Sequence, residues 1–211
     1  MTLQHFLAVV AIVAVVSTAA PASAANTEPI AVIKAPIDAV IAILNDPRYM
    51  ASGTKSDQRK EIWKVINPMF DFQEISRRAV ARHWSDFSAG EKTEFIDVFA
   101  QFLGNTYIDK IQGEYHNEQV IYLDQVLHAD QYAEVRTQLV RETIDIPVNY
   151  RLIKDQSGQW KVYDIIVEGV SLVKNYRTQF ADILRKETPA QLIQRLNQKL
   201  QEQSSHLVDN G

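Results

Sequence analysis

The stretch Trp160–Phe180 decides the fold of this chain, and it reads W-K-V-Y-D-I-I-V-E-G-V-S-L-V-K-N-Y-R-T-Q-F. Its first half alternates as a β-strand does, with Trp160 and Val162 on one face. The apolar residues of the opposite face are Tyr163, Ile165 and Val167. Apolar residues on both faces predict a strand that is covered on two sides.

At Gly169 the period of the pattern changes. Beyond it, apolar residues recur at steps of three and four, namely Val170, Val173, Tyr176 and Phe180. Such a stripe is typical of a helix that buries one face. We therefore predict a buried strand that turns at a glycine into a helix folded back over the sheet.

The composition indicates a soluble globular protein, and the length is enough for one domain of good size or two small ones. The chain has 211 residues, of which 46% are hydrophobic and 23% charged. Its formal net charge of −4 argues against a nucleic-acid partner, because such binding relies on Lys and Arg against phosphate. The absence of cysteine excludes disulfides and thiolate chemistry.

The N-terminus predicts export. Phe6–Val16 is an unbroken apolar run, too short to span a bilayer and typical of the h-region of a signal peptide. Ala22-Ser23-Ala24 is an A-x-A cleavage pattern, so we predict a signal peptide over 1–24 that is removed after Ala24. The n-region has no Lys or Arg, which leaves a retained membrane anchor as the alternative.

The mature chain begins with helices, predicted over 36–113 with Pro36 as the first helical residue. The strongest of them starts at the capping box Ser88-Ala-Gly-Glu91. Its stripe consists of Phe95, Val98, Phe99, Phe102, Leu103, Tyr107 and Ile111. This helix is either the main core helix or the lining of a cavity, and both interpretations can hold at different depths along it.

The period becomes two after the long helix. Four strands are predicted at Gln119–Leu127, Gln131–Arg141, Ile144–Lys154 and Gln159–Glu168. Asp155-Gln-Ser-Gly158 is a turn that makes a hairpin of the last two. C-terminal helices over 170–203 and a disordered tail over 204–211 complete a single domain of residues 25–203. The fold class is α+β, an antiparallel sheet of about four strands with helices packed over it, enclosing an apolar pocket.

The sequence carries no pattern of catalytic or metal-binding residues. The histidines are isolated, and no P-loop, G-x-S-x-G or H-E-x-x-H occurs. We expect Asp164 and Glu168 to form structural ion pairs with Arg151 or Arg177. We therefore expect neither an enzyme nor a cofactor or metal site.

Three segments resemble the MlaC family of periplasmic phospholipid carriers, also known as toluene-tolerance auxiliary proteins of an ABC transport system. The first is V-Y-D-I-I-V-E-G-V-S-L-V-K-N-Y-R-T-Q-F, within Trp160–Phe180. The second, Ala79–Tyr107, reads A-V-A-R-H-W-S-D-F-S-A-G-E-K-T-E-F-I-D-V-F-A-Q-F-L-G-N-T-Y. The third is V-N-Y-R-L-I-K-D-Q-S-G-Q-W-K-V-Y-D. The resemblance covers most of the mature chain, although the N-terminal helices up to Phe70 match only in general character.

The resemblance implies a soluble periplasmic protein that buries the acyl chains of a phospholipid between sheet and helices. Its partners would be an inner-membrane ABC transporter with an MCE-domain protein and an outer-membrane lipoprotein complex, and we expect a monomer. The role would be to maintain the lipid asymmetry of the outer membrane. From face periodicity the acyl-chain pocket is expected among Leu103, Tyr107, Val135, Leu139, Val148, Tyr150, Tyr163, Ile165, Val167, Val170 and Val173.

Two alternatives remain open from the residues. One is a binding module for another small apolar ligand, with Asp164 or Tyr150 as a polar group inside the pocket. The other is a protein-binding adaptor, which would have a filled core and an exposed apolar groove.

Overall fold

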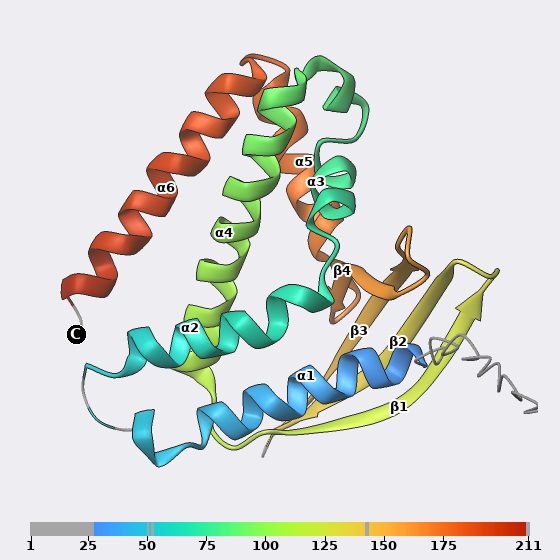
Figure 1. The fold of residues 1–211 in the computed structure, drawn as a ribbon, viewed down its shortest axis with the longest axis vertical. Helices are drawn as coiled ribbons and strands as arrows, with labels where there is room; N and C mark the ends of the chain where they lie inside the picture. Colours follow the sequence, from blue (N-terminus) through green and yellow to red (C-terminus); the bar gives the residue numbers. More distant parts are fainter. Residues whose placement is uncertain (1–27, 50, 52, 142–143, 210–211) are drawn as a thin grey trace, which may run out of the picture.

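The computed structural model describes residues 28–49, 51, 53–141 and 144–209, and shows helices packed on an antiparallel sheet (Figure 1). The predicted signal peptide lies outside these residues. The α-helices are α1 (Pro29–Leu44), α2 (Lys55–Ile66), α3 (Phe72–Val80), α4 (Ala89–Glu114), α5 (Leu172–Leu184) and α6 (Pro189–Asp209). Short 3-10 turns are Pro47–Tyr49, Asn67–Met69 and Ala81–Asp86. The strands are β1 (Gln119–His128), β2 (Tyr132–Val140), β3 (Asp145–Lys154), β4 (Trp160–Val167) and β5 (Val170–Ser171).

The sheet is an antiparallel meander in the order β1-β2-β3-β4-β5. Its first four strands match the predicted ones to within a residue at each end, and the α+β class is confirmed. The added strand β5 follows Gly169, whose φ of 80° lies in the left-handed region that favours glycine. The chain therefore makes a tight turn there before α5 begins.

Helix α1 lies along one face of the sheet, and α2 lies beside α1 (Figure 1). Ile33 of α1 is fully buried against Val135, Leu152 and Val162, one residue from each of β2, β3 and β4. These side chains form the lower core, which holds the middle of α1 to the sheet.

Helix α4 stands away from the sheet and packs with α3, α5 and α6 (Figure 1). It begins as predicted at a capping box, in which Ser88 N–H donates to Glu91 Oε2 at 2.8 Å. The rings of Phe95 and Phe99 stack 5.5 Å apart, and Phe180 of α5 meets both edge-on. This aromatic cluster is the centre of the upper core.

Helix α1 begins earlier than predicted, at Pro29, and Pro36 lies inside it. A proline in a helix removes one backbone hydrogen bond, and burial of Ile33 offsets that loss. The first turn is also held to the sheet, because Ile30 N–H donates to Gln125 Oε1 at 2.8 Å. This partner from β1 is distant in sequence, so local pattern did not reveal the true helix start.

Helix α6 extends to Asp209, where we had predicted a disordered tail from residue 204. Gln203 Nε2 donates to Thr106 Oγ1 of α4 at 2.8 Å. This hydrogen bond holds α6 to α4 at the residue before the predicted start of the tail. Ser204 Oγ also donates to the Leu200 carbonyl within the helix. A side chain of α4 thus supports the last turns of α6.

Gly104→Ala is expected to lower the free energy of unfolding by about 2 kcal/mol, because the added methyl group overpacks the α2–α4 contact. An ideal Cβ at this position would lie 2.8 Å from Trp63 Cε3 of α2. Urea unfolding measures the loss. Gly113→Ala, on the same helix with nothing within 4 Å of its Cβ, is the control and should not destabilise. Equal behaviour of the two variants would contradict this packing argument.

Candidate functional site

A cavity of about 340 Å³ lies between α1, the C-terminal end of α4 and the sheet. This volume falls at the lower end of the range for small-ligand pockets. The helices contribute Ile37, Val40, Ile41, Leu44, Tyr107, Lys110, Ile111 and Glu114. The sheet contributes Val120, Thr137, Leu139, Val148, Tyr150 and Ile165. The end of α2 contributes Ile66, and the connecting segments contribute Met69, Phe70, Tyr115, Glu118 and Arg141.

The register of the sheet brings its lining residues to one face. Thr137 lies opposite Val148 across β2 and β3, and Tyr150 lies opposite Ile165 across β3 and β4. Residues two apart on a strand share a face, so Leu139 joins Thr137. The face that carries Ile33's core partners therefore continues into the cavity.

The face assignment predicted for β4 was half wrong, because the strand contains a β-bulge. Leu152 pairs with Val162 and Arg151 pairs with Asp164, which leaves Tyr163 as an extra residue. The bulge shifts the alternation by one, so Val162 and Ile165 lie on the same face of the sheet. Simple alternation along the strand predicts opposite faces for these two residues.

Some of the predicted pocket residues line the cavity. They are Tyr107, Leu139, Val148, Tyr150 and Ile165. Helix α4 is both a core helix and part of the cavity wall, as the sequence allowed. Its residues Phe95 and Phe99 lie in the upper core, and Tyr107 and Ile111 line the cavity.

The remaining predicted residues lie elsewhere. Leu103 and Val173 are buried in the upper core and Val135 in the lower core, where protein side chains surround them. Tyr163 packs against Arg78, whose Cζ is 4.2 Å from the ring centroid. Val167 and Val170, at the end of the sheet, are 42% and 64% exposed.

Sequence reasoning missed the wall of the cavity that α1 supplies. The stripe Ile37, Val40, Ile41 and Leu44 was visible as a helix face, yet nothing in it said which surface it would cover. Ile66, Met69 and Phe70, which follow α2 or end it, were missed as well. The signal that could have indicated this wall was the apolar face of α1, for which the sequence suggested no packing partner.

The sheet contributes two polar side chains to the cavity wall, Thr137 and Tyr150. Thr137 is buried, and its Oγ1 donates to the Val148 carbonyl at 2.7 Å. Tyr150 lies beside it, and burial raises the pKa of the Tyr150 phenol to about 12. The cavity wall therefore carries no ionised group from the sheet at neutral pH.

Stability is expected to fall between about pH 10 and pH 12, in part because of Tyr150. Its pKa is about 12 in the folded state and about 10 in an unfolded chain, so its contribution is full below pH 10 and is lost as pH rises. Tyr150→Phe should flatten this loss. Urea unfolding at pH 8, 10 and 11 tests it, and parallel losses in both proteins would refute the assignment.

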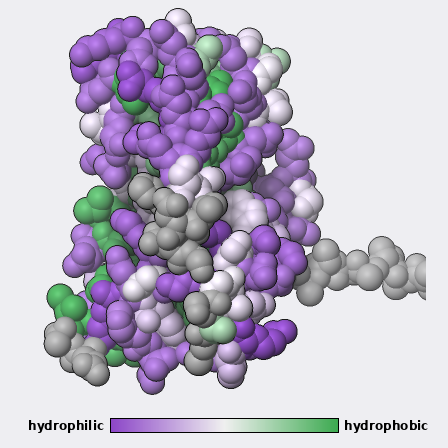
Figure 2. All heavy atoms as spheres, turned by 90° about the vertical axis from the view of Figure 1, so that its left-hand side faces the viewer, coloured by the Kyte–Doolittle hydropathy of each residue, from purple (hydrophilic) through white to green (hydrophobic). Residues whose placement is uncertain are grey.

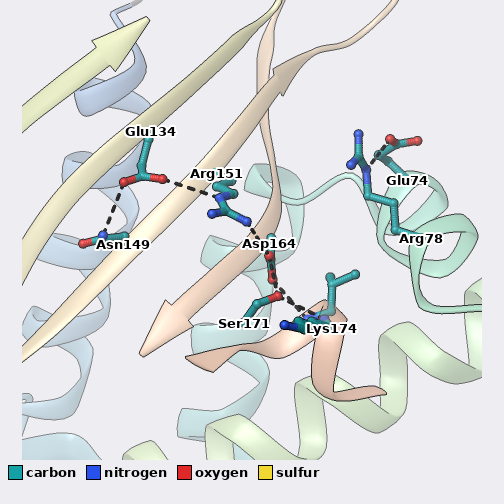
Figure 3. Close-up of polar contacts among 9 residues, drawn as sticks. Glu74, Arg78, Glu134, Asn149, Arg151, Asp164, Ser171 and Lys174 are labelled. Atoms are coloured by element: carbon teal, nitrogen blue, oxygen red, sulfur yellow. Dashed lines mark hydrogen bonds and ion pairs between the residues drawn. The ribbon is translucent and has the colours of Figure 1, made fainter. Parts of the chain in front are cut away.

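Asp164 does not line the cavity, and its hydrogen bonds join β4 to the start of α5 (Figure 3). It accepts hydrogen bonds from Ser171 Oγ at 2.7 Å and from Val173 N–H at 3.0 Å. Arg151 Nη1 lies 3.6 Å from its Oδ2, as predicted for a structural ion pair. Arg177 instead donates to the Arg78 carbonyl. Of the two polar candidates for a pocket, only Tyr150 lines the cavity.

Charged residues meet at one end of the cavity. Arg141 Nε lies 3.1 Å from Glu118 Oε1, and Arg141 Nη2 lies 4.0 Å from Glu114 Oε2. The backbone N–H of His116 also donates to Glu118, and hydrogen bonding together with Arg141 holds the pKa of Glu118 below its usual range despite burial. Lys110 is the fourth charged lining residue.

The exposed apolar residues gather in the half of the molecule that contains the cavity. Figure 2 shows apolar surface along the lower left, whereas the upper half is mainly hydrophilic. In the described ranges the exposed large residues are Ile111, Ile121, Leu123, Leu127, Ile144, Val167 and Val170.

Two other kinds of site are absent from the described part of the chain. None of the helices in the described part of the chain is both long and apolar enough to cross a membrane. Across those same residues, no three His, Cys, Asp or Glu side chains are grouped so that they could hold a metal ion.

The chain matches one family model and two curated relatives. The model of the MlaC protein matches residues 34–198. The intermembrane phospholipid transport system binding protein MlaC of Haemophilus influenzae is 21% identical over 160 residues, which is 74% of this chain and 71% of the relative. The toluene tolerance protein ttg2D of Pseudomonas putida is 27% identical over 130 residues, 58% of this chain and 57% of the relative.

A solved structure has a similar fold. The phospholipid-binding protein of Ralstonia solanacearum, solved in complex with a phospholipid, superposes with a TM-score of 0.71 at 26% sequence identity. The match covers 84% of this chain and 99% of that one.

Proposed function

Because the chain belongs to the MlaC family, we propose that it binds a phospholipid by its acyl chains and carries it through the periplasm. The observation that carries this proposal is the cavity between α1 and the sheet, whose wall consists mainly of aliphatic and aromatic side chains. The phospholipid in the Ralstonia solanacearum relative and the name of the Haemophilus influenzae relative support it. No reaction is catalysed.

The energetics suit a carrier. Each buried methylene gains about 0.8 kcal/mol relative to water, so two acyl chains would exceed the practical ceiling of about 18–21 kcal/mol for non-covalent affinity. In a bilayer, however, the chains are already out of water. Transfer between bilayer and cavity is then close to balanced, while release into water is strongly opposed. The lipid must be handed over in direct contact with a partner.

We propose the two partners that the family resemblance implies. One is an inner-membrane ABC transporter with an MCE-domain protein, and the other is an outer-membrane lipoprotein complex. The chain acts between them as a monomer after its signal peptide is removed at Ala24, and so maintains the lipid asymmetry of the outer membrane.

Native mass spectrometry of the mature protein, purified from cells without detergent, tests the proposal. We expect a protein-plus-phospholipid mass at near-stoichiometric occupancy, with the lipid identified after organic extraction. A bare protein mass that stays bare after incubation with phospholipid vesicles and the partner complexes would overturn it. A different apolar ligand in the cavity, or a stable complex with protein alone, would point to the two alternatives.

A further inference from the structure

The charged residues of the cavity lie at its one end, where α4 stops and β1 begins. Lys110 and Glu114 belong to the last turns of α4, and Glu118 immediately precedes β1. Arg141 immediately follows β2, and the pairing of Gln119 with Val140 brings it opposite Glu118. The rest of the wall is formed by aliphatic and aromatic side chains together with Thr137. This end is where a polar headgroup would meet the protein when acyl chains fill the cavity.

Two of these charges neutralise each other. The Glu118 side chain is 6% exposed and is fixed by both Arg141 and the His116 N–H. Glu114, by contrast, has a side chain that is 64% exposed, and its contact with Arg141 is at 4.0 Å. Arg141 therefore serves mainly to compensate the buried Glu118, and Glu114 keeps an accessible carboxylate.

Lys110 also keeps an accessible charge. Among the described residues it makes no ion pair, and its Nζ lies 5.8 Å from the centroid of the Tyr107 ring. Lys110 and Glu114 are four residues apart on α4, so their Cβ atoms are about 5–6 Å from each other on one side of the helix. The cavity end thus presents one accessible cation and one accessible anion, one helical turn apart.

A zwitterionic phospholipid has the complementary pair of charges, a phosphodiester and an ammonium group joined by two carbons. We propose that Lys110 binds the phosphodiester and Glu114 binds the ammonium group of a phosphatidylethanolamine-type headgroup, a selectivity that rests on the carrier function proposed above. The C-terminal end of α4 adds to the attraction for the ammonium, because helix C-termini favour cations. An anionic headgroup without an amine offers Glu114 no cationic partner. Its negative charge and the Glu114 carboxylate also repel each other.

The expected selectivity is modest. Exposed ion pairs contribute little, so a preference of about two- to fivefold for zwitterionic over anionic lipid is expected. It should shrink at high salt, because the contacts are open to solvent.

To test this proposal, the purified protein is incubated with vesicles of equal parts phosphatidylethanolamine and phosphatidylglycerol. Native mass spectrometry then reads the ratio of the two lipids among the loaded molecules. Glu114→Gln should bring the ratio close to that of the vesicles, and Glu114→Lys should invert it. The control is Glu94→Gln, an exposed residue near the other end of α4, which should retain the wild-type ratio.

Different results would contradict the headgroup selectivity and the carrier function. Loaded protein that mirrors the vesicle composition, with a ratio that Glu114→Lys leaves unchanged, would overturn the headgroup proposal and leave the carrier function standing. Wild-type protein that takes up neither lipid would overturn the carrier function itself. A preference lost equally in Glu94→Gln would show a general charge effect and would also overturn the headgroup proposal.

Discussion

Replacing Leu139 and Val148 together by tryptophan is expected to lower phospholipid loading at least tenfold while the protein stays folded. Both side chains line the cavity from neighbouring strands, and neither belongs to the fully buried cores. The indole rings therefore enter space that an acyl chain would occupy, and they should not displace core side chains. Tenfold corresponds to about 1.4 kcal/mol, less than the burial of two methylenes.

The measurement is the occupancy by native mass spectrometry, together with the thermal unfolding midpoint. Leu123→Trp is the matched control, because Leu123 is 56% exposed on β1 and lies outside the cavity. It should load as the wild type does. A folded double variant with wild-type occupancy would place the acyl chains elsewhere and remove the main support for the proposed site.

Asp164→Ala is expected to cost about 3 kcal/mol of unfolding free energy. The carboxylate is buried and accepts two hydrogen bonds from the start of α5, so its loss leaves the Val173 N–H without its partner. Arg151 also loses one of its two carboxylate neighbours, the other being Glu134 (Figure 3). Helix α5 should then detach from β4 more readily.

Urea unfolding measures this cost. Asp124→Ala is the control, because Asp124 pairs with Arg136 at 2.7 Å but is about half exposed, so its loss should cost less than about 1 kcal/mol. Where Asp164→Ala is still folded, it should load phospholipid normally, since Asp164 does not line the cavity. Similar costs for both variants would refute the structural role, and loss of loading in the folded variant would revive Asp164 as a ligand-binding group.

The sequence predicted those helices and strands whose stabilising contacts lie within one segment of the chain. Helix α4 was predicted well because its cap, Ser88 with Glu91, and its aromatic stripe are within one segment. The hairpin of β3 and β4 was predicted from its turn. The start of α1 depends on Gln125, almost a hundred residues away, and could not be read from Pro29 or Pro36 alone.

The site was predicted less completely than the fold. Periodicity identified Leu139, Val148 and Tyr150, because β2 and β3 pair without interruption where they line the cavity. It could not separate residues that line a cavity from residues such as Val135 that fill a core, since both are apolar and face inward. That distinction depends on how closely α1 approaches the sheet at each point.

The bulge in β4 has a consequence for comparing this chain with its relatives. Tyr163 is the residue of β4 that has no partner in β3, so a relative that lacks this one residue would keep Val162 and Ile165 on the same face and Asp164 on the other. An alignment gap placed at any other position of β4 would exchange the two faces of the strand beyond it. Insertions and deletions between Trp160 and Val167 should therefore be assigned to position 163.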